Sequence, residues 1–128
     1  SVATKHIEVY LEACTGCPDT IYDEKRQRTR IRWLKENTKE PAVEIGCATG
    51  FVTSFVGANV GIDSKPSRVR LAKIKYPTKE FLISDAMHLP FKENSFKTVL
   101  VPELLEHLDL DQVQKVLIEC KRVGKTLS

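Results

Sequence analysis

The stretch Val43-Glu44-Ile45-Gly46-Cys47-Ala48-Thr49-Gly50 decides how this chain is expected to fold. An apolar run with β-branched residues leads into a loop flanked by glycines, and a helix-like segment, Phe51–Val56, follows the loop. This order is typical of a buried parallel strand that turns sharply into a helix, and glycine lets a ligand approach the backbone where a Cβ would collide. The stretch therefore predicts a strand, a tight loop and a helix at a ligand-binding edge.

The spacing of Gly46 and Gly50 narrows the kind of ligand. A nicotinamide or flavin site would show G-x-G-x-x-G, but Ala48 and Phe51 stand at the second and third glycine positions. The sequence also lacks the Gly-Lys-Ser/Thr ending of a phosphate-binding loop. A nucleotide-like cofactor without phosphates fits this loop better, which disfavours a nicotinamide-dependent oxidoreductase.

Three more strand candidates follow the glycine loop. Residues 58–62 end at Asp63, about twenty residues after the loop, where a carboxylate can accept both hydroxyls of a ribose. Residues 81–84 end at Asp85, and residues 96–101 form the fourth candidate. Strands that alternate with helix-like segments predict an α/β fold with a parallel sheet and helices on both faces.

Four blocks of sequence match one family in order and spacing: VEIGCATG, GIDSKPSRV, SDAMHLPFKENSFKTV and PELLEHL. With them the chain resembles the class I S-adenosylmethionine-dependent methyltransferases, of the small-molecule type similar to the ubiquinone/menaquinone methyltransferase group. The blocks cover residues 41–108. The resemblance implies a Rossmann-like sheet in the strand order 3-2-1-4, S-adenosylmethionine as the cofactor, and methyl transfer to an acceptor that is most simply a small molecule.

The resemblance also implies roles for particular residues. Asp63 would bind the ribose, Asp85 would accept the adenine amine, and Glu44 would anchor the glycine loop and the methionyl end. His107 either borders the methyl-transfer position as a base or only begins the helix after strand four. The expected cofactor-binding residues are Glu44, Gly46, Cys47, Ala48, Gly50, Asp63, Ser64, Asp85, Ala86, Met87, Val101 and Pro102.

Two positions depart from the family pattern. Ala48 stands where the first motif usually has its central glycine, which adds one methyl group beside the expected ligand. Lys97 stands where an acid usually follows the serine and aromatic residue before strand four. We expect the second departure to have a structural consequence only.

The domain organisation predicted from this resemblance is an N-terminal segment, residues 1–21, followed by a cofactor-binding domain over residues 22–128. The family's remaining strands are missing from the sequence, so strand four is predicted to be an apolar edge, which natural proteins avoid leaving bare. We expect a homodimer to cover it, or the N-terminal segment to fold across it. The alternative function is a truncated S-adenosylmethionine-binding module without independent catalysis that acts through a partner.

Composition describes an ordinary globular domain: 128 residues, 41% hydrophobic, 29% charged and a net charge of +3. The sequence shows no apolar run of membrane-spanning length and no signal sequence, which predicts a cytoplasmic protein without membrane contact.

The four cysteines are expected to be thiols. Cys14 and Cys17 form a C-x-x-C pair, which is half of a zinc site, a redox pair or an inert loop, and we favour the loop. The methyl transfer that the resemblance implies requires no metal.

Helices are predicted over residues 22–37, from Pro66 to before Pro77, and from Asp109 or Asp111 to a stop at Gly124. The first two are strongly basic, and because runs of charge usually lie on solvated helix faces, we favour that interpretation over a nucleic-acid-binding surface. Their expected inward residues are Ile31 and Leu34 in the first helix, and Val69, Leu71 and Ile74 in the second.

Overall fold

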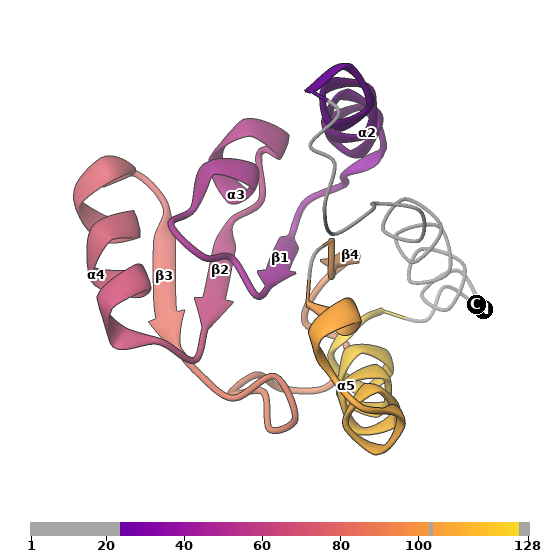
Figure 1. Ribbon diagram of the computed structural model, residues 1–128. Coiled ribbons are helices and arrows are strands. Elements are labelled where there is room, and N and C mark those ends of the chain that lie inside the picture. Colours follow the sequence, from indigo (N-terminus) through magenta and orange to yellow (C-terminus); the bar gives the residue numbers. More distant parts are fainter. Residues whose placement is uncertain (1–23, 103, 126–128) are drawn as a thin grey trace.

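The computed structural model describes residues 24–102 and 104–125. Figure 1 shows their elements, a small parallel sheet with helices around it. The predicted segment 1–21 and the pair Cys14 and Cys17 lie outside the described residues. The elements in chain order are α2 (Glu24–Asn37), β1 (Ala42–Ile45), α3 (Phe51–Val56), β2 (Val60–Asp63), α4 (Pro66–Lys75), β3 (Glu80–Ile83), β4 (Thr98–Leu100), the 3₁₀ helix η1 (Leu105–His107) and α5 (Leu110–Val123).

The four strands are parallel and lie in the order β3-β2-β1-β4, which confirms the predicted order. Val43 of β1 is in register with Val60 of β2 on one side and with Val99 of β4 on the other. The order of the strands therefore reverses at β1. In sheets of this kind, ligands bind beyond the carboxyl ends of the strands at such a reversal.

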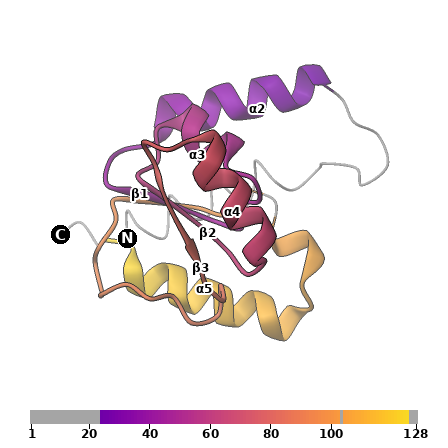
Figure 2. The same cartoon turned by 90° about the vertical axis from the view of Figure 1, so that its left-hand side faces the viewer.

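Helices cover both faces of the sheet because the side chains of β1 alternate between them. Val43 and Ile45 pack in one cluster with Val116, Cys120 and other residues of α5. Ala42 packs on the opposite face in a cluster that includes Leu34 of α2 and Val56 of α3. Figure 2 shows α2 and α3 on one side of the sheet and α5 on the other.

The inward face of α4 differs from the prediction. Val69 is buried, but Leu71 and Ile74 are 43% and 72% exposed, and Ala72 is buried instead. The helix packs through Val69 and Ala72 against Phe81 of β3. Positions 69 and 72 are three apart and share a helix face, whereas the apolar residues 71 and 74 lie on another. With several apolar positions available, the contact with Phe81 decides the orientation of the helix.

The helix ends follow the local sequence signals closely. α4 begins at Pro66, as predicted. α5 begins after Asp109, whose side chain accepts from the N–H of Gln112, while the Gln112 side chain accepts from the N–H of Asp109. α5 ends at Val123, and Gly124 caps it as predicted, yet Gly124 has φ −79° and is extended rather than left-handed. The reason is that the chain here turns into a bridge between Gly124 and Phe96.

This bridge lies beside the predicted apolar edge at β4. The N–H of Phe96 donates to Val123 O at 3.0 Å, and the N–H of Lys125 donates to Phe96 O at 2.7 Å. All three residues of β4 are buried. The backbone before β4 therefore has hydrogen-bond partners within the chain, and the homodimer stays a prediction.

Candidate functional site

The glycine loop joins β1 to α3 at the carboxyl edge of the sheet. The N–H groups of Gly46 and Cys47 both donate to Ile62 O, at 2.9 and 2.8 Å, which ties the loop to the neighbouring strand. Gly46 has φ +80°, and a Cβ added there would lie 3.2 Å from Cβ of Leu104. A side chain at position 46 would therefore be strained by the backbone and crowded by Leu104.

Asp63, at the end of β2, holds this loop. Its Oδ2 accepts from the N–H of Ala48 at 3.0 Å, and its Oδ1 accepts from the N–H of Lys65 at 2.9 Å. Nη1 of Arg68, in the first part of α4, lies 3.8 Å from Oδ2. A carboxylate has about four lone-pair sites, so these contacts leave acceptor capacity on both oxygens for a ligand.

A cavity of about 190 Å³ opens beside Gly46 and Asp63. It combines two carboxylates, one guanidinium and an apolar wall from several elements. Its lining residues are Gly46, Ile62, Asp63, Ser64, Arg68, Ser84, Asp85, Ala86, Met87, Leu104, Leu108 and Val116.

Asp85 contributes the second carboxylate, two residues after the end of β3. Its Oδ1 accepts from the N–H of Met87 at 2.9 Å, and its Oδ2 lies 3.2 Å from Nδ1 of His88. These contacts lower the pKa of Asp85 below its ordinary value, mainly through the Met87 N–H and next through His88. The carboxyl is therefore an ionised acceptor at neutral pH, and it is 52% exposed at the cavity.

Glu44 is buried behind the loop on β1. Its Oε1 accepts a hydrogen bond from the hydroxyl of Thr53 in α3. The strand before the loop and the helix after it are thus joined by a buried polar contact. The anchoring role of Glu44 stays a prediction.

The two described cysteines, Cys47 and Cys120, are buried free thiols. Burial raises the pKa of each to about 12, and the carboxylates of Glu44 and Asp63 add to the effect at Cys47. Both are neutral thiols at physiological pH, so neither is poised as a nucleophile. Among the described residues, no group of three or more His, Cys, Asp and Glu side chains could hold a metal ion.

The structure brings half of the predicted cofactor-binding residues together on one cavity wall. These are Gly46, Asp63, Ser64, Asp85, Ala86 and Met87. The other predicted residues do not line this cavity: Glu44, Cys47, Ala48, Gly50, Val101 and Pro102. Their cofactor contacts stay predictions.

His107 lies in η1 with 71% of its side chain exposed, and Nε2 is 3.6 Å from Oε1 of Glu106. It does not line the described cavity, whereas Leu104 and Leu108, on either side of η1, do. The catalytic role of His107 stays a prediction.

Sequence reasoning missed six lining residues: Ile62, Arg68, Ser84, Leu104, Leu108 and Val116. Ile62 and Ser84 adjoin the two acids in sequence, so their proximity was available as a signal. Val116 belongs to α5, far along the chain, and only the packing of α5 under the sheet brings it to the cavity.

Within the described part of the chain, no helix combines the length and the apolar character that crossing a membrane requires.

Comparisons with known proteins show the family and the fold of this chain. A family model described as a methyltransferase domain matches residues 43–126. A demethylmenaquinone methyltransferase of Thermotoga maritima is 26% identical over 109 residues, which are 80% of this chain and 47% of that protein. The chain thus spans about half the length of this curated relative.

Solved structures share the fold. The PH0226 protein of Pyrococcus horikoshii superimposes with a TM-score of 0.69 at 24% identity, over 84% of this chain and 56% of that one. A Thermotoga maritima S-adenosylmethionine-dependent methyltransferase, named as a possible histamine N-methyltransferase, gives a TM-score of 0.64 at 24% identity, over 75% of this chain and 45% of that one.

Proposed function

We propose that this chain, which belongs to the methyltransferase domain family, binds S-adenosylmethionine in the 190 Å³ cavity and transfers its methyl group to a small-molecule acceptor. The observation that carries the proposal is that Asp63 and Asp85 line one cavity together with Gly46. These residues come from the ends of three adjacent parallel strands, where this class of sheet binds nucleotides.

The residues at the cavity fit an adenosyl group. Asp63 keeps acceptor capacity for the two ribose hydroxyls after its two backbone hydrogen bonds. Asp85 is ionised and accessible, which suits an amine donor on the base. Ile62, Met87 and Leu108 provide apolar surface for the adenine ring, and Gly46 leaves the space that a Cβ would fill.

When bound, S-adenosylmethionine supplies a methyl group that is already activated by its positive sulfur. The protein therefore has to align the acceptor and exclude water rather than provide a strong base. Asp63 and Asp85 would fix the adenosyl end, and the glycine loop, held by Asp63 and backed by Glu44, would fix the methionyl end.

The acceptor class rests on resemblance and on the curated relative. That relative is named as a methyltransferase of demethylmenaquinone, a small molecule.

Calorimetric titration with S-adenosylmethionine tests the cofactor assignment. Asp63→Ala should weaken binding by about 2–3 kcal/mol, because it removes charge-assisted hydrogen bonds to the ribose. Asp111→Ala, an exposed carboxylate on α5 paired with Lys115, is the matched control and should bind normally. An unchanged dissociation constant in Asp63→Ala, with the circular dichroism spectrum intact, would remove the assignment.

A second experiment separates catalysis from binding alone. The protein is incubated with S-adenosylmethionine labelled at the methyl group and a cell extract, and label is counted in the small-molecule and macromolecular fractions. Label in small molecules supports the proposal. Binding without any turnover would support a binding module that acts through a partner, and label in macromolecules would overturn the small-molecule acceptor.

A further inference from the structure

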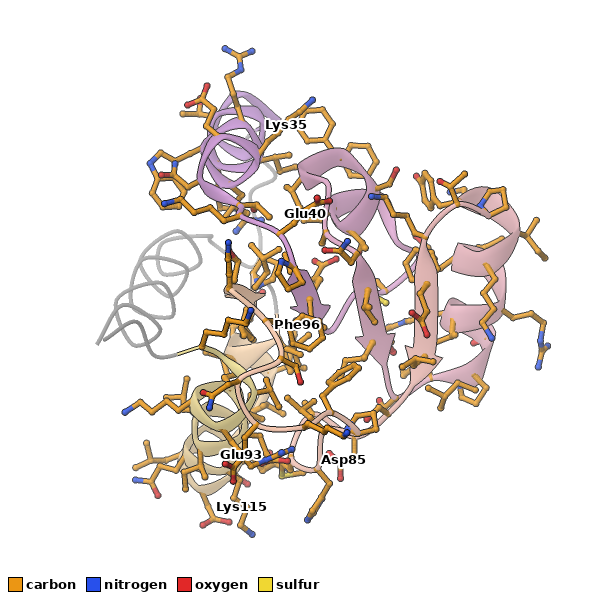
Figure 3. All side chains as sticks on the ribbon, turned by 180° about the vertical axis from the view of Figure 1, so that it is seen from behind. Lys35, Glu40, Asp85, Glu93, Phe96 and Lys115 are labelled. Carbon is orange, nitrogen blue, oxygen red and sulfur yellow. The ribbon has the colours of Figure 1, made fainter. Side chains whose placement is uncertain are left out.

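The segment after Asp85 has no regular secondary structure, yet two side chains of α5 hold its backbone. The N–H of Leu89 donates to Oε1 of Glu119 at 2.8 Å. Nη2 of Arg122 donates to Leu89 O at 2.9 Å, and Nη1 donates to Phe91 O at 2.7 Å. Figure 3 shows Asp85 and Glu93 at the two ends of this segment, which reaches α5.

Glu119 and Arg122 also bind each other. Nε of Arg122 lies 2.6 Å from Oε2 of Glu119, and Nη2 lies 3.0 Å from Oε1. Their side chains are 16% and 31% exposed, so solvent screens the pair less than a surface ion pair. The hydrogen bond from Arg122 is the main cause of the lowered pKa of Glu119. The planar guanidinium thus contacts a carboxylate and two carbonyls at once, which a lysine cannot reproduce.

Packing fixes the same segment from the other side. Leu89 is 5% exposed and belongs to the main core cluster, and the ring of Phe91 meets that of Phe96 edge-on with centroids 4.9 Å apart. The held residues begin two positions after Met87, the last cavity residue of the segment. Met87, whose N–H donates to Asp85, thus lies two residues from a backbone position that α5 holds.

α5 contributes to the cavity in two ways. Val116 lines it directly, and Glu119 and Arg122, one and two turns further along, hold the segment that carries Asp85, Ala86 and Met87. Cys120 and Val123 on the same helix are fully buried in the core under the sheet. The buried helix thus fixes the position of one wall of the cavity.

We propose that the Glu119–Arg122 pair is a positioning device for the adenine side of the site, and that it sets how strongly the site selects adenine over other bases. The proposal rests on the proposed function. The two residues act through the backbone of Leu89 and Phe91, and they do not touch the ligand.

The test compares two probes, S-adenosyl-L-homocysteine and S-inosyl-L-homocysteine, whose base carries an oxygen in place of the adenine amine. Arg122→Met should weaken the first probe by about tenfold and the second much less, since misplacing Asp85 costs a hydrogen bond that only adenine makes. Arg122→Lys should recover only part of the loss. Lys115→Met, on the exposed side of the same helix, is the matched control and should keep both affinities.

A role in stability alone predicts a different pattern. A lowered melting temperature with both dissociation constants unchanged, or an equal loss for both probes, would overturn the proposal. Glu119→Gln, which changes charge but little volume, replaces Arg122→Met if that variant fails to fold, and the same outcomes apply.

A readout without ligand keeps the inference separate from the proposed function. The Leu89 amide, which Glu119 accepts, should exchange with deuterium about tenfold faster in Arg122→Met than in Lys115→Met. Failure of the wild-type protein to bind S-adenosyl-L-homocysteine would overturn the proposed function. Unchanged exchange at Leu89 would overturn the positioning role of the Glu119–Arg122 pair.

Discussion

Ala48 adopts a backbone conformation that residues other than glycine rarely take. Its φ is +48°, in the left-handed region, while its N–H donates to Asp63. An L-residue with a Cβ pays roughly 1–2 kcal/mol there. This explains in physical terms why the family pattern has glycine at the position where this chain has alanine.

Ala48→Gly should therefore stabilise the protein. Relief of the left-handed strain is offset in part by the larger chain entropy of glycine in the unfolded state, which leaves a net gain of about 1 kcal/mol in the free energy of unfolding. Urea denaturation checks this. Ala86→Gly, at a position without positive φ, is the control and should give no gain; a loss of stability in Ala48→Gly would contradict the strain argument.

Asp63 shows how much of a residue's role its sequence position reveals. Its place at the end of the second strand predicts contact with a ligand, and the structure puts it on the cavity wall. Its hydrogen bonds to the N–H groups of Ala48 and Lys65 could not be predicted, since they depend on how the loop from β1 lies against β2. The same carboxylate thus holds the glycine loop and lines the cavity.

At the scale of elements, α5 depends on a well-defined start. Asp109 and Gln112 exchange side-chain and backbone hydrogen bonds there, the reciprocal arrangement that satisfies helix N-terminal donors. Asp109→Ala should lower the free energy of unfolding by about 1 kcal/mol because one N–H loses its acceptor. Thermal unfolding measures the loss against Asp111→Ala, which removes an exposed contact with Lys115 and a first-turn charge but leaves the cap in place. Equal melting temperatures for the two variants would contradict the capping role.

The elements themselves were well predicted where local signals are strong. Four strands and the helices between them follow from apolar runs, glycines and caps around Pro66 and Asp109. The order of the strands follows from the family resemblance, and the structure confirms it. The orientation of α4 was not, because its apolar residues surround the helix and only packing against Phe81 selects Val69 and Ala72. The reach of α5 to the cavity also escaped prediction, since Val116 and Arg122 carry no local mark of contact with the segment after β3.

For the whole molecule, two carboxyl groups with lowered pKa values link stability to pH. Asp85 and Glu119 have ordinary values of 3.8 and 4.5, and both are lowered in the folded state. A carboxyl of this kind stabilises the fold above its ordinary pKa, and that contribution is lost as the pH falls through its folded value. Acid should therefore remove the stabilisation that both carboxyl groups provide. For Glu119, protonation removes the charge that pairs with Arg122.

Glu119→Gln should accordingly flatten the pH dependence of stability. Wild type should be more stable than the variant at pH 7, and the difference should shrink as the pH drops below about 4.5, where Glu119 begins to be protonated in the unfolded chain. Urea midpoints measured from pH 7 to pH 3 check the trend, with the exposed Glu36→Gln as control. If the difference in stability between wild type and variant stays constant over this range, the charge on Glu119 does not contribute to the stability of the fold.

The position of β1 between β2 and β4 has a consequence for how the protein is made. The glycine loop, Asp63 and Asp85 leave the ribosome within one continuous stretch, while β4 and α5, which complete the neighbourhood of β1, emerge later. A nascent chain that ends just after Asp85 already carries both acids, but the helix that supports the second one has not yet been synthesised. We therefore expect the cavity wall that carries Asp85 to form late in synthesis, when α5 docks under the sheet.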